Sequence, residues 1–326
     1  MKKKILSIKN LNVSYQTPNG RLQAIRDISM NIHAGEIVGL VGESGSGKST
    51  LMQSVLQLLA PQAKVESGQI LLGETDILSL SPDKMRAILG DRISVVFQDP
   101  MKSLNPVLTI GRQMIDIQYR RQESKEQKRQ RAIAMLHKVR IPDPEDRLNR
   151  YPHEFSGGMR QRVAIAMALM AEPELLVADE PTTALDATLE VATIDLLKEL
   201  QSEIGCAILF ITHHLGVVAE LCDQMYVMYA GELVESGDVI SVFTAPKHPY
   251  TQLLFACDPA QINQRTRHLP TIGGMLPNLV QVPEGCIFAA RCPQAFDRCH
   301  TVKPQAVFSP VGDLIRCHLA SQEAGQ

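Results

Sequence analysis

The chain has 326 residues, of which 44% are hydrophobic and 21% are charged, and its formal net charge is −2. This composition is typical of a globular protein with a sizeable core, and the near-neutral charge argues against a general attraction for nucleic acid. No apolar run approaches the roughly 20 residues of a membrane span, and none follows the N-terminal lysines as in a signal peptide. We therefore expect a cytosolic chain of about two domains.

The first part of the chain predicts a β-hairpin and then a strand, loop and helix. Residues 5 to about 30 hold short β-like runs separated by the turn TPNG, as in an antiparallel hairpin. EIVGLVG predicts a buried strand that ends in glycine, and a helix is expected from about Lys48 to Leu59.

Farther along, strands and helices alternate. Apolar runs predict strands near 69–72, 93–97, 174–179, 206–211 and 224–229. Helical patterns fill the gaps, notably at 187–203, where Val191, Ile194, Leu197 and Leu200 recur at helical spacing. Such alternation implies a largely parallel sheet covered on both faces, so the expected fold class is α/β.

Two regions depart from this pattern. Between about 106 and 150 the charged run RRQESKEQKRQR and the proline-rich break IPDPEDR indicate a helical insertion. After HPYT at 248–251 the periodicity weakens and proline, glycine and cysteine become frequent, which indicates a second, small, loop-dominated unit.

The string GESGSGKST at 42–50 follows a predicted strand and opens a predicted helix, the context that indicates a phosphate-binding loop. Glycines let successive backbone N–H groups point at phosphate oxygens, and the helix N-terminus adds a partial positive charge. Lys48 is expected to reach the β- and γ-phosphates, and the Ser49 hydroxyl to bind Mg²⁺. The expected nucleotide-binding residues here are Gly42, Ser44, Gly45, Ser46, Gly47, Lys48, Ser49 and Thr50.

The string LLVADEP supplies the acidic groups that phosphoryl transfer to water needs. Asp179 ends the predicted strand and is a candidate Mg²⁺ ligand, and Glu180 is a candidate base for the attacking water. An acidic pair after a strand is weak evidence alone, because turns favour aspartate. Together with the upstream loop it predicts nucleotide hydrolysis.

These motifs, with FSGGM at 155–159, TTALD at 182–186 and ITHH at 211–214, resemble the nucleotide-binding subunit of ABC transporters over residues 5–255. The resemblance implies an ATPase with a P-loop NTPase cassette that combines a mostly parallel sheet, an antiparallel β subdomain and a helical subdomain. The expected domains are a nucleotide-binding domain at 1–255, with its helical insertion at about 100–170, and a Cys-rich extension at 256–326.

In that family two subunits pack head to tail, and the SGG element of each caps the ATP held by the other. The resemblance therefore implies that Ser156, Gly157 and Gly158 bind the partner's ATP, and N–H groups at a helix start suit a γ-phosphate. Here Met159 stands where the family usually has glutamine, so a hydrogen bond from an amide side chain is absent.

The resemblance assigns further roles one residue at a time. Tyr15 matches the aromatic residue that stacks on adenine, with a half-buried strand tyrosine as the alternative. Gln98 matches the glutamine that senses Mg²⁺ and the attacking water, and Asp186 an aspartate of a loop that crosses the dimer interface. His213 matches the histidine that contacts the γ-phosphate, while His214 stands where aspartate is usual.

The strings FQDPMKSLNP, YPHEFSGGMRQRV, MYAGELVESG and HPYTQLL resemble the importer subgroup for dipeptides, oligopeptides and nickel. The resemblance implies a second, unequal ABC ATPase subunit, two transmembrane permease subunits that contact the region of SLNP at 103–106, and an extracytoplasmic solute-binding protein. It implies a peripheral position on the cytoplasmic face of the inner membrane. Two alternatives stay open: uptake of nickel or a metal chelate, and a soluble ABC ATPase with a redox-sensing role.

Four of the seven cysteines crowd into the last 41 residues. Cys286, Cys292, Cys299 and Cys317 are separated by five, six and seventeen residues. Four thiols suit either a Cys₄ zinc site or an iron–sulfur cluster. The uneven gaps favour a cluster, and the extension resembles that of dipeptide-type ATPases to which a 4Fe-4S cluster has been assigned. Zinc and unligated thiols remain alternatives.

Overall fold

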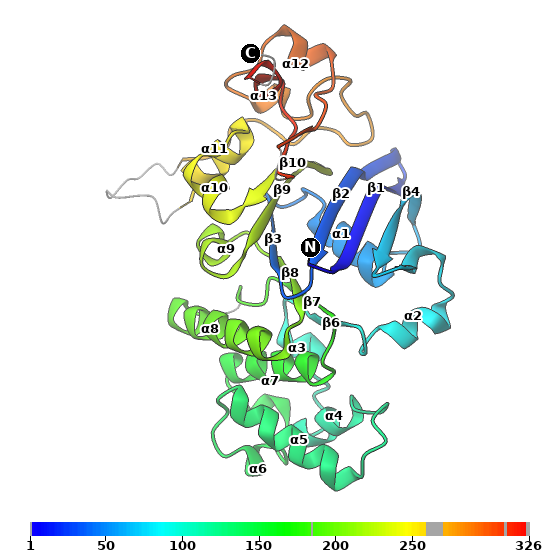
Figure 1. The fold of residues 1–326 in the computed structure, drawn as a ribbon, viewed down its shortest axis with the longest axis vertical. Helices are drawn as coiled ribbons and strands as arrows, with labels where there is room; N and C mark the ends of the chain where they lie inside the picture. The colour runs from blue at the N-terminus through cyan, green and yellow to red at the C-terminus, as the bar shows by residue number, and fades with distance from the viewer. Residues whose placement is uncertain (1, 184, 259–269, 310–311, 324–326) are drawn as a thin grey trace. The chain divides into compact units, whose positions relative to one another are not determined.

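The computed structural model describes residues 2–183, 185–258, 270–309 and 312–323 (Figure 1). The chain forms two compact units, each assembled from separate segments. Unit 1 consists of Met1–Ile5, His33–Glu36 and Leu80–Phe210, and unit 2 consists of Leu6–Ile32, Ile37–Ser79 and Ile211–Gln326.

Unit 2 contains the predicted N-terminal hairpin. The long strands β1 (Lys4–Thr17) and β2 (Gly20–His33) belong to a four-stranded sheet of order β2-β1-β4-β5, with β4 (Ala63–Leu72) and β5 (Thr75–Asp76). β4 runs antiparallel to β1. A short 3₁₀ helix, η1 (Ile77–Ser79), follows.

A second set of strands in unit 2 carries the predicted phosphate loop. The fully buried strand β3 (Ile37–Val41) pairs in parallel with β9 (Gln224–Tyr229), and β10 (Glu232–Asp238) pairs antiparallel with β9. Two short strands of the Cys-rich extension, β12 (Leu314–Ile315) and β11 (Val307–Phe308), continue beyond β10. The extension is therefore joined to the cassette by backbone hydrogen bonds.

The helices of unit 2 follow these strands. They are α1 (Lys48–Leu56), α9 (Leu215–Leu221), α10 (Val239–Thr244), α11 (Pro249–Ala256), η4 (Ala289–Arg291), α12 (Asp297–Thr301) and α13 (His318–Glu323).

Unit 1 contains the parallel strands β6 (Ile93–Val96) and β7 (Leu175–Asp179), with β8 (Ala207–Ile211) next to β7. The helices of unit 1 are α2 (Pro82–Ile88), α3 (Pro100–Ser103), α4 (Ile110–Asp116), α5 (Lys125–Lys138), α6 (Pro144–Arg147), η2 (Pro152–Glu154), α7 (Gly157–Met170) and α8 (Ala187–Ile204). Of these, α3 to α7 occupy the region of the predicted helical insertion.

Local sequence explains several helix limits. Ser124 and Gln127 form a capping box that starts α5, and Gly205, with φ 75°, ends α8. The helical spacing predicted within α8 holds for Ile194, Leu197 and Leu200, which are buried, but Val191 is 49% exposed. Val191 thus lies outside the apolar face that the pattern assigned to it.

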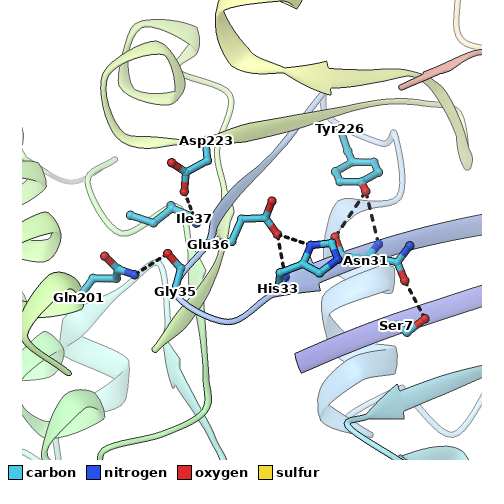
Figure 2. Close-up of polar contacts among 9 residues, drawn as sticks. All are labelled: Ser7, Asn31, His33, Gly35, Glu36, Ile37, Gln201, Asp223 and Tyr226. Atoms are coloured by element: carbon cyan, nitrogen blue, oxygen red, sulfur yellow. Dashed lines mark hydrogen bonds and ion pairs between the residues drawn. The ribbon is translucent and has the colours of Figure 1, made fainter. Parts of the chain in front are cut away.

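Polar contacts fix the turn before β3 (Figure 2). In unit 1 the Glu36 carboxylate accepts a hydrogen bond from His33 N–H (2.7 Å), and Gln201 donates to the Gly35 carbonyl (3.1 Å). In unit 2 the Asp223 carboxylate accepts from Ile37 N–H (2.8 Å), and Asp223 N–H donates back to the Ile37 carbonyl (2.8 Å). The first residue of β3 is therefore held on both sides of its backbone.

No helix in the described ranges combines the length and apolar character needed to cross a bilayer.

Candidate functional site

The loop between β3 and α1 curls around the side chain of Lys48. The Lys48 ammonium donates to the carbonyl oxygens of Gly42 (2.7 Å) and Glu43 (3.0 Å) and lies 3.5 Å from Ser46 Oγ. Gly42 has φ 150°, and a Cβ there would lie 2.1 Å from the Met228 carbonyl oxygen, so this position requires glycine. Since α1 begins at Lys48, its first N–H groups lie at the loop, as an anion site needs.

Neighbouring segments of unit 2 brace the loop. Gly231 N–H donates to the Ser46 carbonyl (2.8 Å), which ties the β9–β10 turn to the loop. The hydroxyl of Tyr15, a half-buried residue, lies 3.3 Å from Thr50 Oγ1 in the first turn of α1. The structure therefore brings the predicted adenine-stacking residue to the helix of the phosphate loop, while its stacking role stays a prediction.

His213 follows β8 and is exposed. The preceding residue, Thr212, donates its N–H to the Leu40 carbonyl (3.3 Å), so this segment lies against the strand that leads into the phosphate loop. The ring of His214 meets that of His213 edge to face, with centroids 4.7 Å apart.

In unit 1 the predicted base lies at the end of β7, one residue after Asp179. Glu180 has φ 45°, a strained value for a residue with a side chain. One oxygen of its carboxylate, Oε2, accepts hydrogen bonds from Gln98 Nε2 (2.9 Å) and Thr183 Oγ1 (3.0 Å). Gln98 follows β6, which runs parallel to β7, so both side chains come from the carboxyl ends of neighbouring strands. The pairing of Gln98 with Glu180 joins two residues that the resemblance placed in one reaction.

The SGG element begins α7. The hydroxyl of Ser156 caps the helix by accepting from Met159 N–H (3.3 Å). A Cβ at Gly158 would lie 3.1 Å from Leu189, whereas a Cβ at Gly157 would meet nothing within 4 Å. A side chain at 158 would therefore press on Leu189, whereas the packing of the described residues gives no reason for glycine at 157.

Two other residues of these motifs, Phe155 and Asp186, can be placed. Phe155 is buried, with the Arg147 guanidinium 5.7 Å from its ring centroid. Asp186 caps α8, and its carboxylate accepts a hydrogen bond from Leu189 N–H (3.0 Å). Asp186 and Gly158 therefore both contact Leu189, which links the starts of α8 and α7.

The SLNP segment leads into a loop that carries an exposed apolar side chain. Gln113 Nε2 donates to the carbonyl oxygens of Asn105 and Leu108 (3.0 Å each). Ile110 N–H donates to the Arg150 carbonyl (2.9 Å), so the end of this loop lies beside the segment before α7. Val107 and Tyr151, on the two segments, are 75% and 40% exposed.

The four late cysteines converge on one small cavity in the extension. Cys286, Cys292, Cys299 and Cys317 all line it, together with His248, Phe288 and His318, and its volume is about 10 Å³. Burial and then the neighbouring thiols raise the pKa of Cys286 to about 12, and burial also raises the pKa of Cys292 and Cys317. In the described residues no group of three or more His, Cys, Asp or Glu side chains is arranged to hold a metal ion.

Two residues outside the loop contact it through Glu43, and the sequence interpretation singled out none of the three. The Tyr250 hydroxyl accepts from Glu43 N–H (2.9 Å), and the Arg291 guanidinium pairs with the Glu43 carboxylate. The string HPYT contained Tyr250 but was used only as a subgroup marker. An acidic residue inside a phosphate loop was the available signal for Glu43, whereas nothing local marks Arg291.

Comparison with known proteins agrees with this geometry. The family model described as ABC transporter matches residues 25–183, and the one described as oligopeptide/dipeptide transporter, C-terminal region, matches residues 234–299. The dipeptide transport ATP-binding protein DppD of Bacillus subtilis is 45% identical over 98% of this chain and 96% of its own length. The oligopeptide transport ATP-binding protein OppD of Haemophilus influenzae is 42% identical over 98% of both chains.

Solved structures share the fold of the cassette. A dimeric ATP-binding cassette, MJ0796, in a post-hydrolysis state with ADP and Pi is 30% identical, with a TM-score of 0.64 over 72% of this chain and 98% of that one. The cbiO1 subunit of the Clostridium perfringens transporter complex cbiONQ is 32% identical, with a TM-score of 0.65 over 75% of this chain and 92% of that one. The chain therefore belongs to the ABC transporter family of ATP-hydrolysing cassettes, among the members that carry the oligopeptide/dipeptide transporter C-terminal region.

Proposed function

We propose that this chain is the ATP-hydrolysing subunit of an importer for dipeptides or oligopeptides. The observation that carries the proposal is the likeness to DppD of B. subtilis, which spans both the cassette and the C-terminal region over 98% of the chain. The match of residues 234–299 to the oligopeptide/dipeptide transporter model supports the substrate class. We propose the cassette at 1–255 and the extension at 256–326 as its functional division.

In ATP hydrolysis Lys48 would bind the β- and γ-phosphates within the loop 42–50, and Tyr15 would stack on adenine. The loop's carbonyl oxygens hold the Lys48 ammonium at the start of α1, which supports that role. Mg²⁺ would be bound by Ser49, Gln98 and Asp179, oxygen donors of the kind that Mg²⁺ prefers.

Glu180 would act as the base for the attacking water, and His213 would contact the γ-phosphate. The hydrogen bonds from Gln98 and Thr183 to the Glu180 carboxylate support this assignment, because they fix the orientation of the proton acceptor. The strained backbone of Glu180 supports it as well, since such strain clusters at functional sites.

The SGG element would close over ATP held by a second ABC ATPase subunit. Gly157 supports this role: its backbone is exposed at the start of a 14-residue helix, and nothing around it in the described residues excludes a larger side chain. The dimeric MJ0796 cassette supports a two-subunit arrangement by analogy. Asp186 would lie at the same interface. We propose an unequal second subunit, as the subgroup resemblance implies.

Two permease subunits and an extracytoplasmic solute-binding protein would complete the importer, with this chain peripheral on the cytoplasmic face of the inner membrane. The exposed side chains of Val107 and Tyr151 support a docking surface for a permease helix near SLNP, because apolar surface on an ordered loop is suited to a protein contact.

Cys286, Cys292, Cys299 and Cys317 would hold a 4Fe-4S cluster. Their shared cavity supports this ligand set, since thiolates are the ligands that iron–sulfur clusters take. The bound cluster would supply structural rigidity or one-electron chemistry.

The importer function is tested by uptake. Membrane vesicles that contain the chain with its permeases and solute-binding protein are expected to accumulate a labelled dipeptide when supplied with ATP, and vesicles with Lys48→Ala are not. ATP-dependent uptake of nickel in place of dipeptide would refute the substrate class. Anaerobic purification with iron and acid-labile sulfide analysis tests the cysteines: equal amounts of both support the cluster, and zinc or neither metal contradicts it.

A further inference from the structure

In unit 2 a buried arginine of the Cys-rich extension contacts the phosphate loop. The side chain of Arg291 is 5% exposed, and that of Glu43 is 28% exposed. Arg291 Nη1 lies 2.8 Å from Glu43 Oε2, and Nη2 lies 3.1 Å from Glu43 Oε1. The guanidinium and carboxylate therefore form a two-pronged pair, the strongest geometry for such groups.

Every N–H of the Arg291 guanidinium has an acceptor. Besides the two bonds to Glu43, Nε donates to the Gly273 carbonyl (2.9 Å), Nη2 to the Ile272 carbonyl (2.9 Å) and Nη1 to the Tyr229 hydroxyl (3.2 Å). Because arginine has five N–H donors, this group is fully satisfied, and lysine could reproduce only part of the set. Acceptors from the extension and from β9 thus hold the Arg291 guanidinium in the orientation in which it contacts the loop.

On the loop side, Glu43 is held at three points. Arg291 holds its carboxylate, and the hydroxyl of buried Tyr250 accepts from its N–H (2.9 Å). Its carbonyl accepts from the Lys48 ammonium (3.0 Å). A displacement of Glu43 would therefore move the carbonyl oxygen that accepts a hydrogen bond from the Lys48 ammonium.

A second contact from the extension reaches the same loop. A Cβ built at Gly45 would lie 3.3 Å from Leu276 Cδ1, so the Leu276 side chain lies beside the loop at this point. Leu276 and Arg291 of the extension are therefore both neighbours of the phosphate loop.

We propose that Arg291 is a positioning residue for ATP binding, because through Glu43 it holds the phosphate loop in the shape that presents Lys48 to the nucleotide. Arg291 acts through Glu43 and needs no contact with ATP of its own. The inference rests on the proposed role of Lys48 and the loop 42–50 in nucleotide binding.

The test compares MgATP hydrolysis by the full-length chain carrying Arg291→Met, Arg291→Lys or Glu43→Gln. Arg291→Met is expected to raise KM about tenfold, because a hydrogen-bonded charge pair that orders the loop is lost. The kcat at saturating ATP should change by less than about twofold, because the groups that react are intact. Arg291→Lys should recover part of the affinity, since it keeps the charge but loses the fork.

Arg316→Met is the matched control. Arg316 is also buried in the extension, beside Cys317, but it pairs with Asp27 (3.3 Å), which lies outside the loop. Its substitution should leave the KM for ATP within about twofold of the parent chain. An equal rise in KM for Arg316→Met would show a general loosening of the extension and would overturn the proposal.

A double variant gives an independent measure. If Arg291 acts through Glu43, the KM of Arg291→Met combined with Glu43→Gln should match that of the more affected single variant. Multiplied effects, or an unchanged KM in a folded Arg291→Met chain, would contradict the proposal. If Arg291→Met does not fold, the Glu43→Gln variant alone tests the proposal. An unchanged KM for ATP in Glu43→Gln would then refute it.

Lys48→Ala separates this inference from the proposed function. Retained ATP binding in Lys48→Ala, measured with a fluorescent nucleotide, would refute the phosphate-loop assignment itself. Lost binding in Lys48→Ala with an unchanged KM in Arg291→Met would refute only the role of Arg291.

Discussion

Gly157 and Gly158 are neighbours in sequence, yet different contacts surround them. Leu189 lies against Gly158, whereas no atom of the described residues lies within 4 Å of a Cβ built at Gly157. Gly157→Ala should therefore keep or slightly raise the thermal stability, because alanine favours a helix by about 1 kcal/mol over glycine. ATP-dependent dimerisation and turnover should fall at least about tenfold, because under the proposed capping role the added methyl group would face the partner's nucleotide.

Gly158→Ala is the matched comparison. Its Cβ would lie 3.1 Å from Leu189, so thermal unfolding should occur at lower temperature than in Gly157→Ala. Normal turnover in Gly157→Ala, measured with the partner subunit present, would contradict the proposed capping role.

Glu180→Gln separates nucleotide binding from hydrolysis. The amide oxygen can still accept from Gln98 and Thr183, so the local hydrogen bonds survive while the proton acceptor is lost. Turnover should fall by about 10² to 10⁴, as on loss of a general base, whereas a fluorescent ATP analogue should bind as to the parent chain. Thr183→Val removes one hydrogen bond to Glu180 but keeps the carboxylate, so it should lower turnover far less than Glu180→Gln. Hydrolysis by Glu180→Gln at the parent rate would disprove the base assignment.

Sequence reasoning finds site residues when a motif is local. Lys48 lies at the start of α1, and Asp179 and Glu180 lie at the end of β7; each belongs to a characteristic string, and the structure places them where that string predicts. Arg291 escaped because its partner Glu43 is 248 positions away and no short string records such a contact. Gly157 shows the converse case. The string FSGGM marks it as a candidate site residue, although the packing around it gives no reason for glycine.

At the scale of elements, continuous apolar runs predict the buried strands well. β9 occupies 224–229 as expected, and β3, β6, β7 and β8 fall within about one residue of the predicted positions. The two-residue strands β11 and β12 could not be predicted, because a period of two needs a longer run, and they exist only by pairing with β10. The first helix ends at Leu56, before the expected Leu59, where Gln57 turns to φ 52°.

An ion pair at the starts of β6 and β7 gives unit 1 an acid-sensitive contact. Arg92 Nε lies 2.5 Å from Glu174 Oε1, and this hydrogen bond is the main cause that lowers the pKa of Glu174. A carboxylate with a lowered pKa adds stability above its unfolded value near pH 4.5, and this stability is lost as pH falls through the folded pKa.

The unfolding free energy, measured in urea at pH 7 and below pH 4, should therefore decline less on acidification in Glu174→Gln than in the parent chain. Because the pair is about one-third exposed, the difference should be small. A steeper acid dependence in Glu174→Gln would contradict the sign argued here.

For the molecule as a whole, the extension behaves as part of unit 2. β12 pairs with β10, Lys303 lies 2.6 Å from the buried Glu232 carboxylate, and Arg291 holds Glu43. A chain that ends at residue 258 should therefore bind ATP more weakly, because Glu43 loses its partner. It should also aggregate, because the edge of β10 is uncovered.

Light scattering and nucleotide titration of the shortened chain would measure both effects. A monodisperse product with the parent affinity for ATP would contradict this view. From the composition, the sequence predicted a second, small, loop-dominated unit. It could not foresee the pairing of β12 with β10, because pairing between distant strands leaves no local pattern.

The Arg291–Glu43 pair also limits protein engineering. A C-terminal extension could be exchanged between paralogous ATPases to transfer its cysteines. The grafted extension would then place the donor's residue at position 291, arginine or not, beside the recipient's phosphate loop. Such chimaeras should keep the recipient's affinity for ATP only when donor and recipient match at both 43 and 291, and a compensating pair of substitutions should restore that affinity in a mismatched graft.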